Sequence, residues 1–241
     1  MRFKKIIKLF EEGNVCVTGL KGRGKDLLMS NVVVRRGLPY VANVDYGGDF
    51  HPFRLSDYDC GKNTYKDFLS GHVKYYKYPY PDGTDLYLSD CGIYFPSQYC
   101  NELNRDYKYF PVYMAISRHI SDASVHFNVQ NLNRCWDKLR EMSDCYILCR
   151  RAFVLFGFAF QLVRIYDQYE SCLKKIRPFS VRVPLICTRQ TKVMVQMQRD
   201  QYLAAHGQIR NAILIYKHKS TYDTRFFKKL LEGGIKPCED S

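Results

Sequence analysis

The sequence predicts an α/β fold, with a mainly parallel central sheet flanked by helices and a small basic C-terminal extension. Three observations predict it. Short apolar runs rich in β-branched residues alternate with segments of helical spacing along residues 3–166. A strand, a helix and a second strand follow one another within about 30 residues, which is the pattern of a parallel βαβ unit. The segment after residue 170 differs, because it is basic and contains Pro178 and Pro184.

Local signals place each element in chain order. Apolar spacing of three and four residues predicts helices, β-branched runs predict strands, and Gly13 and Gly37 end the first two helices. Residues 46–84 are polar and rich in Gly, Tyr and Asp, which predicts loops around one short helix. The expected helices are 3–12, 25–36, 65–69, 107–119, 132–142, 195–206 and 224–232, and the expected strands are 14–18, 40–45, 84–90, 123–130, 145–149, 152–166 and 212–216. We expect 145–149 and 152–166 to pair as a hairpin or to lie as neighbouring strands.

A glycine-rich loop connects the first strand to the second helix. Residues 19–26 are Gly-Leu-Lys-Gly-Arg-Gly-Lys-Asp, which fits the phosphate-loop pattern G-x-x-x-x-G-K between a strand and a helix. Glycines let backbone amides close around phosphate oxygens, and the helix N-terminus adds partial positive charge. Lys25 would reach the terminal phosphates. We therefore predict a site for ATP formed by Gly19, Leu20, Lys21, Gly22, Arg23, Gly24, Lys25, Asp26 and Leu27.

Two carboxylates are the candidate Mg²⁺ ligands. Asp26 stands where the pattern normally has a Ser or Thr whose hydroxyl binds Mg²⁺. A carboxylate is a good ligand for this hard cation but repels phosphate without the metal, so we expect nucleotide binding to depend steeply on Mg²⁺. Asp90 ends the apolar run 86–90, in the place of the aspartate that orients Mg²⁺ from a strand next to the loop. Cys91 and Gly92 follow it, and neither supplies a catalytic carboxylate.

Gln130 and Arg118 complete the candidate catalytic set with Lys25 and Asp90. Gln130 ends a predicted strand beside the strand of the loop, where it would sense the γ-phosphate or position water; the alternative is a surface amide. Arg118 is a candidate for an arginine finger that reaches the nucleotide of a neighbouring subunit, as are Arg134 and Arg140. The sequence contains no G-x-S-x-G elbow and no H-E-x-x-H motif, which argues against a serine hydrolase or a zinc protease.

Charge and cysteine spacing bear on partners and compartment. The chain has 37 Lys and Arg against 24 Asp and Glu, a net charge of +13. This excess favours a polyanionic partner such as nucleic acid, nucleotide or an anionic membrane surface, with solubility alone as the alternative. The N-terminus does not form a signal peptide, and no C-x-x-C pair occurs, so we expect reduced thiols in a cytoplasm. The most apolar segment, 152–160, is too short to span a bilayer, so we expect a soluble or peripheral protein.

The order of these motifs resembles that of the zonula-occludens-toxin-like (Zot-like) family of phage ATPases, which includes the assembly ATPase of filamentous phages. The chain departs from the family pattern at Asp26, in having no acid after Asp90, and in having no transmembrane helix after the ATPase domain. The resemblance covers about residues 13–166 and is carried by the loop 19–26, Pro39–Val44, Leu86–Asp90, Ser117–His119, the strand to Gln130, the helix 133–142 and the extended segments after Cys145.

The resemblance implies a P-loop ATPase domain over residues 1–170 and a basic extension over 171–241 packed on the core. It implies a homo-oligomer in the host cytoplasm, or peripheral at the inner membrane, that couples ATP and Mg²⁺ to phage morphogenesis. The implied partners are single-stranded DNA, phage coat and assembly proteins and an envelope assembly complex, with packaging or extrusion of virions as the outcome. Two alternatives stay open: a nucleotide-binding assembly scaffold that does not hydrolyse ATP, and a basic DNA-binding module with a vestigial loop.

Overall fold

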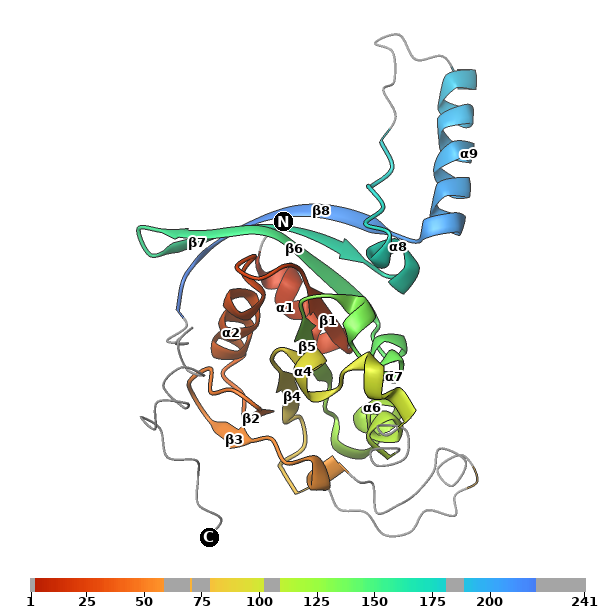
Figure 1. The fold of residues 1–241 in the computed structure, drawn as a ribbon. Coiled ribbons are helices and arrows are strands. Elements are labelled where there is room, and N and C mark those ends of the chain that lie inside the picture. The colour runs from red at the N-terminus through yellow and green to blue at the C-terminus, as the bar shows by residue number, and fades with distance from the viewer. Residues whose placement is uncertain (1–2, 59–69, 71–78, 102–108, 181–188, 220–241) are drawn as a thin grey trace.

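The computed structural model describes residues 3–58, 70, 79–101, 109–180 and 189–219. A single eight-stranded sheet runs through the molecule, and helices cover both of its faces (Figure 1). The predicted α/β fold with a mainly parallel central sheet is therefore confirmed.

The sheet has the strand order β3-β2-β4-β5-β1-β6-β7-β8. Neighbours from β3 to β6 are parallel, whereas β6, β7 and β8 are antiparallel. β5 lies between β1 and β4, so the strand before Asp90 is not next to the strand of the loop, which corrects the sequence prediction. The strands are β1 (Val15–Thr18), β2 (Tyr40–Ala42), β3 (Phe50–Pro52), β4 (Asp85–Leu88), β5 (Val125–Val129), β6 (Cys145–Leu155), β7 (Phe158–Tyr166) and β8 (Ile209–Lys217).

The helices follow the predicted order. α1 and α2 have the predicted bounds, and Gly37 ends α2 with a φ of 61° while its N–H donates to the Val33 carbonyl. The helices are α1 (Phe3–Glu12), α2 (Lys25–Arg36), α4 (Cys91–Tyr94), α6 (Tyr109–Ser121), α7 (Asp137–Glu141), α8 (Tyr169–Leu173) and α9 (Arg189–His206), with 3₁₀ turns η1 (Leu55–Tyr58), η3 (Ser97–Tyr99) and η4 (Leu132–Arg134).

The helix predicted over 132–142 is wrong in its first half. η4 and α7 are separated at Cys135, which forms a bridge with Pro96, and at Trp136, whose backbone N–H donates to the Phe95 carbonyl at 2.8 Å. Trp136 is fully buried. Burial of this side chain and the contact with a distant segment therefore outweigh the local helical spacing.

Two predictions on strands also need correction. β6 continues through Arg150 to Leu155 with a bulge between Cys149 and Arg151, so the hairpin with β7 turns at 156–157 and not near 150. Phe50–Pro52 forms β3 within the segment predicted to be loop, because pairing with β2 holds a strand too short for a sequence signal. The helices predicted at 65–69 and 224–232 lie outside the described residues.

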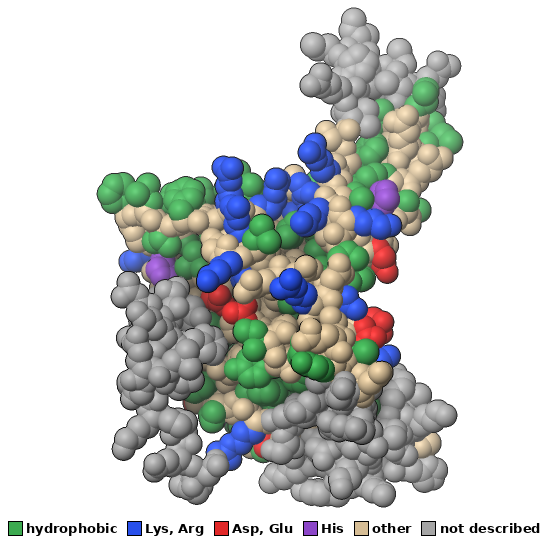
Figure 2. Space-filling view, viewed as in Figure 1, with side chains coloured by type: hydrophobic (Ala, Val, Ile, Leu, Met, Phe, Trp, Pro, Cys, Tyr) green, Lys and Arg blue, Asp and Glu red, His purple; other side chains and the backbone are tan. Residues whose placement is uncertain are grey.

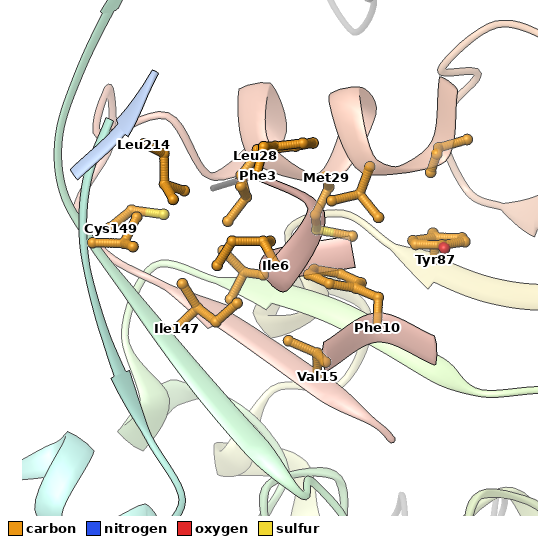
Figure 3. Packing of buried hydrophobic residues seen from close by; sticks show 14 of the residues in the cluster. Phe3, Ile6, Phe10, Val15, Leu28, Met29, Tyr87, Ile147, Cys149 and Leu214 are labelled. Carbon is orange, nitrogen blue, oxygen red and sulfur yellow. The ribbon is translucent and has the colours of Figure 1, made fainter. Parts of the chain in front are cut away.

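Alternation along the buried strands divides the core between the two faces of the sheet. Val15 and Val17 of β1 pack with α1 and α2, whereas Cys16 packs with α6 and α7 on the other face. Figure 3 shows the first of these cores, in which Ile6 and Phe10 of α1 lie between α2 and the sheet. Because every residue of β1 is buried, the loop that follows it starts from a fixed point.

A buried ionic cluster closes the edge of the sheet where the parallel strands begin. We call Arg36, Asp85, Tyr87 and His126 the amino-edge cluster. Asp85 of β4 accepts from Arg36 at the end of α2 and from the Ser124 N–H at 2.8 Å, and its carboxylate lies 3.4 Å from His126 Nε2. Arg36 also donates to the Tyr87 hydroxyl. These contacts tie the end of α2 to the first residues of β4 and β5.

The charges of the amino-edge cluster are balanced within it. Burial raises the pKa of the Asp85 carboxyl, but His126, Arg36 and the Ser124 N–H together hold that pKa below its ordinary value. Burial lowers the pKa of His126 more than Asp85 raises it, so the imidazole is neutral at pH 7. Its Nδ1 can therefore accept from the Val15 N–H, 3.3 Å away.

The segment after residue 170 contributes to the same sheet. β8 pairs with β7 along nine residue pairs, and its inward side chains Ala212, Leu214 and Tyr216 join the core beneath α1. α9 projects away from the sheet (Figure 1). The division near residue 170 stays a prediction. Within the described part of the chain, no helix combines the length and the apolar character needed to cross a membrane.

Candidate phosphate-binding site

The glycine-rich loop joins the carboxyl end of β1 to the first residue of α2. Gly19, Gly22 and Gly24 have φ angles of 146°, 74° and 82°, which residues with a side chain rarely adopt. At Gly19 an added Cβ would also lie 2.5 Å from the carbonyl oxygen of Cys149. The course of the loop therefore depends on glycine at these positions.

The antiparallel strands β6 and β7 pack against the last part of the loop. A Cβ at Gly24 would lie 2.3 Å from the Cβ of Ala152 in β6. The Gly24 carbonyl accepts a hydrogen bond from Gln161 Nε2 of β7, and Gln161 Oε1 accepts from the Tyr216 hydroxyl at 2.9 Å. Gln161 is 1% exposed. This amide holds the loop at the point where α2 begins.

Lys25 is the first residue of α2 and is only 4% exposed. Among the described residues, none gives its amino group a hydrogen bond or an ion pair. An unpaired ammonium group with little access to water is unfavourable, and the N-terminus of α2 adds further positive potential. The arrangement therefore favours an anion at this point.

The carboxylate of Asp26 is held by two strands. Its Oδ1 accepts from Ser89 Oγ after β4 and from Asn128 Nδ2 of β5, each at 2.7 Å. Asn128 Oδ1 accepts in turn from the Asp90 N–H at 2.9 Å. Asn43, after β2, exchanges two hydrogen bonds with the backbone of Ser89. We call Lys25, Asp26, Ser89 and Asn128 the carboxyl-edge cluster.

Asp90 follows β4 in a left-handed conformation with a φ of 46°. A non-glycine residue in this region is uncommon, and such residues concentrate at functional sites. Gln130 Nε2, just after β5, lies 3.5 Å from Asp90 Oδ1. Lys25 and Asp26 at the start of α2 therefore lie at the same edge of the sheet as Asp90 and Gln130, which follow β4 and β5.

The two carboxylates fit a Mg²⁺ ion in part. Among the described residues, Asp26 Oδ2 has no hydrogen-bond partner, and the Asp90 carboxylate accepts only the long contact from Gln130. Among these residues, no group of three or more His, Cys, Asp or Glu side chains is arranged to hold a metal. Mg²⁺ commonly takes one or two carboxylates and completes its shell with phosphate and water. The pair Asp26 and Asp90 suits that kind of site.

Arg118 does not lie at this edge. It is exposed in the last turn of α6 and lines a cavity of about 300 Å³ with Asn14 and Asp144, which precede β1 and β6. It is therefore at the opposite edge of the sheet from the loop of its own chain. Arg134 is exposed after β5, whereas Arg140 donates to the Tyr169 hydroxyl at 2.7 Å. The finger role of Arg118 stays a prediction that requires a second subunit.

A cavity of about 650 Å³ opens beside the loop, on the side of β6. Its size falls in the range of sites for small molecules, about 300–1,000 Å³. Arg23 of the loop and three further cations surround it, and Lys and Arg side chains gather over β6, β7 and β8 on this side (Figure 2). The lining includes Thr18, Gly19, Leu20, Arg23, Gln130, Asn131, Leu148, Arg150, Arg151, Leu162, Leu173 and Lys175.

Sequence analysis missed three residues that shape the site. Ser89 directly follows β4, Asn128 lies in β5 and Gln161 lies in β7; each is a buried polar side chain beside apolar neighbours in the sequence. Because buried polar groups are nearly always hydrogen-bonded, such a side chain signals a specific partner. It does not identify that partner, which comes from another strand or helix in all three cases.

No protein-family model matches the sequence, and no curated protein matches it. Among solved structures, the chain is similar to the N-terminal domain of zonular occludens toxin from Neisseria meningitidis, with 12% identity, a TM-score of 0.34 and coverage of 90% of this chain and 97% of that one. It is also similar to the genome packaging NTPase B204 from Sulfolobus turreted icosahedral virus 2 in complex with ATP-gammaS, with 16% identity, a TM-score of 0.38 and coverage of 65% and 93%. A third is EssC (ATPases 2 and 3) from Geobacillus thermodenitrificans, with 11% identity, a TM-score of 0.41 and coverage of 81% and 44%. At these identities and TM-scores, the assignment of the site rests on the geometry described above.

Proposed function

We propose that the chain is a P-loop ATPase whose loop 19–27 binds the phosphates of ATP. The observation that carries this proposal is Lys25 at the start of α2, a residue that is only 4% exposed and whose amino group has no partner among the described residues. The β- and γ-phosphates of ATP supply the negative charge that this group lacks, and the loop amides together with the helix N-terminus supply hydrogen bonds to the same oxygens. Leu27, half-buried behind the loop, packs against the core and holds the first turn of α2.

The nucleoside half of ATP would occupy the cavity beside the loop. That cavity adjoins Gly19 and Arg23, so phosphates on the loop leave the sugar and base pointing into it. Apolar surface from Leu148, Leu162 and Leu173 suits the faces of a base, and the surrounding cations suit the α-phosphate.

Asp26 and Asp90 would hold Mg²⁺, which neutralises charge on the β- and γ-phosphates during transfer. Ser89 and Asn128 fix the Asp26 carboxylate through Oδ1, which leaves Oδ2 directed to a ligand. Asn128 also fixes the backbone of Asp90, so one amide positions both carboxylates. Gln130, next to Asp90, would orient the attacking water or contact the γ-phosphate.

Hydrolysis depends on more than binding. Cys91 and Gly92 stand directly after Asp90, and neither is a carboxylate. Activation of water would therefore fall to Gln130 and to an arginine from a neighbouring subunit. A nucleotide-binding scaffold that changes conformation without turnover is the second candidate, and the missing acid after Asp90 favours it.

A role in handling phage DNA is suggested by the order of motifs in the sequence. That order resembles Zot-like phage ATPases, so we propose that ATP drives packaging or extrusion of phage DNA by a homo-oligomer. The net charge of +13 suits a DNA partner. If the loop were vestigial instead, the protein would bind DNA in a salt-dependent way that ATP does not change, and it would bind no nucleotide at millimolar concentration.

Calorimetry and phosphate release separate the candidates. Titration with ATP and Mg²⁺ is expected to show binding to the wild type and a loss of about 100-fold or more in Lys25→Ala, corresponding to ~3 kcal/mol. Lys8→Ala, an exposed lysine on α1, serves as the matched control. Phosphate release that disappears in Lys25→Ala supports the ATPase, whereas binding without release supports the scaffold. Equal binding by both lysine variants and the wild type would refute the site.

A further inference from the structure

The antiparallel strands β6, β7 and β8 carry apolar side chains on both of their faces. On the inner face, Ala159, Leu214 and Tyr216 belong to the core. On the outer face, large apolar side chains remain exposed: Phe153 57%, Leu155 50%, Phe156 91%, Phe158 46%, Ile213 63% and Ile215 57%. We call these six residues the apolar face. An antiparallel sheet with one face in solvent normally carries polar residues there, so this pattern is unusual.

The strand register brings the apolar face together. Phe153 pairs with Phe160, which pairs with Ile215 on β8, and the rings of Phe153 and Phe160 stack with centroids 5.0 Å apart. Leu155 pairs with Phe158 in the next row towards the turn. The residues therefore form one continuous surface that leads to the free end of the hairpin, where hydrophobic side chains gather in Figure 2.

The turn of the hairpin places an aromatic ring at the most exposed position. Phe156 and Gly157 have φ angles of 48° and 73°. Turns with positive φ at both central residues usually have Asn, Asp or Gly at the first of them. A Phe in this position is conformationally unfavourable and gains no packing within the chain, since it is 91% exposed. Contact with an apolar phase outside the chain would offset that cost.

The charges around the apolar face all have the same sign. Residues 145–166 and 209–219 contain no Asp or Glu, and their charged residues are Arg150, Arg151, Arg164, Arg210, Lys217 and Lys219. Arg151 lies in the row of Leu162 and Ile213, and Lys217 pairs with Phe158 beside the turn. Both are exposed, so cations border the apolar face towards the body and beside its free end.

We propose that the apolar face binds the surface of an anionic lipid bilayer. The rings of Phe153, Phe156 and Phe158 enter the boundary between headgroups and acyl chains, while Arg151 and Lys217 contact lipid phosphates. Apolar side chains bordered by cations are the combination that binds such surfaces, because burial of apolar area and attraction to anionic headgroups add. Of these residues, Arg151 alone also borders the cavity beside the loop 19–27, so the test of membrane binding changes the phenylalanines and leaves Arg151 in place.

Vesicle sedimentation tests the proposal with the full chain. The protein is expected to sediment with vesicles of phosphatidylcholine and phosphatidylglycerol, to bind phosphatidylcholine alone weakly, and to lose affinity as salt is raised. Phe153→Ser with Phe156→Ser is expected to weaken binding at least about tenfold. The control is Met194→Ser with Met197→Ser, which removes two residues of α9 that are 61% and 59% exposed. This control is expected to bind like the wild type.

A second probe reports insertion directly. Phe156→Trp is expected to show a blue shift on anionic vesicles and quenching by brominated acyl chains, whereas the buried Trp136 contributes an unchanged background. Binding that survives in the double phenylalanine variant, or fluorescence of the introduced indole that vesicles leave unchanged, would overturn the proposal. So would dimers of the wild type that the same double variant abolishes without any vesicle binding, because the face would then be a contact between subunits.

Discussion

The two ends of α2 contact polar clusters of opposite character. At its C-terminal end, Arg36 belongs to the amino-edge cluster. There Asp85 accepts from Arg36 and from the Ser124 N–H, and its carboxylate faces His126. At its start, Lys25 and Asp26 belong to the carboxyl-edge cluster, where the lysine has no partner among the described residues and the aspartate has one free oxygen. The segments of β4 and β5 contribute to both clusters together with α2. The same three elements therefore form one cluster whose charges are paired and one with groups available to a ligand.

The difference separates groups that hold the fold from groups that are available to a ligand. Buried charges that satisfy one another are costly to break, because removal of one partner leaves an uncompensated charge. A buried charge without a partner lowers stability and is retained where a ligand supplies the missing charge. We therefore expect substitutions in the amino-edge cluster to change the free energy of unfolding, and substitutions in the carboxyl-edge cluster to change nucleotide binding.

The largest expected effect is on stability. Asp85→Ala removes the carboxylate that accepts from Arg36 and from the Ser124 N–H, and leaves a largely buried guanidinium without a negative partner. We expect the free energy of unfolding to fall by about 3–5 kcal/mol in urea denaturation. Asp82→Asn, an exposed residue in the turn before β4, is the control and should change it by less than about 0.5 kcal/mol. Equal effects of the two substitutions would contradict the account of the amino edge.

A substitution in the loop should affect both properties. Gly24→Ala places a Cβ 2.3 Å from that of Ala152 at a φ of 82°, so either the loop or β6 must move. We expect a loss of about 2–3 kcal/mol in stability and at least about tenfold in ATP affinity, measured by denaturation and calorimetry. Gly83→Ala has a similar φ of 80° with open space around it, and it should cost about 1 kcal/mol without changing affinity. Full ATP affinity in Gly24→Ala would show that the loop geometry is not needed.

Replacing the Asp26 carboxylate should make the difference in ATP affinity between variant and wild type change sign with Mg²⁺. Asp26→Asn keeps an acceptor for Ser89 and Asn128 but removes the charge. Without Mg²⁺ we expect the variant to bind ATP about tenfold more tightly than the wild type, because repulsion of the phosphates is gone, and with Mg²⁺ more weakly. Calorimetry with EDTA and with Mg²⁺ measures both. An affinity of the wild type that is the same in the two conditions would rule out metal binding by Asp26.

The smallest effect is a pH dependence of the free energy of unfolding that arises in the amino-edge cluster. The pKa of His126 in the folded chain lies below its unfolded value of about 6.5, so the unfolded chain binds more protons as the pH falls below that value. Stability from this group is complete above about pH 6.5 and decreases below it. Asp85, whose pKa is also lowered, contributes above about pH 4 and decreases only in stronger acid.

The variant His126→Asn isolates this contribution. Asn retains an acceptor for the Val15 N–H but does not titrate. Between about pH 7 and about pH 5.5, we expect the wild type to lose about 1 kcal/mol more than the variant in urea denaturation. His119→Asn, an exposed residue of α6, should follow the wild type. A variant with the same pH slope as the wild type would place the titrating group elsewhere.

Sequence analysis located the parts of the site that depend on neighbours along the chain. The loop 19–26, its flanking strand and helix, and the end of α2 at Gly37 follow from local spacing and glycine chemistry, and the structure has them where expected. The positions of Asp90 and Gln130 at one edge follow from parallel strands alone. The strand order does not, because nothing near β4 records that β5 separates it from β1.

The remaining errors share a physical cause. Asn128 and Gln161 take partners more than a hundred residues away in sequence, so their roles depend on pairings that local pattern cannot resolve. The expected segments 145–149 and 152–166 are divided at 150–151, but β6 continues through a bulge there and the turn comes at 156–157. Trp136 ends a local helix by entering the core.

Thermal unfolding of the wild type and of Lys25→Met, with and without Mg²⁺ and ATP, shows whether Lys25 binds the phosphates. Methionine fills the space of the lysine without its charge. We expect the apo variant to unfold at the same or a higher temperature than the wild type, because an unpaired charge with little access to water is gone. Nucleotide at about 100 times its dissociation constant should stabilise the wild type by about 2.7 kcal/mol and leave the variant unchanged. An apo variant that is clearly less stable, together with equal stabilisation of both proteins by ATP, would contradict the assignment of Lys25 to the phosphates.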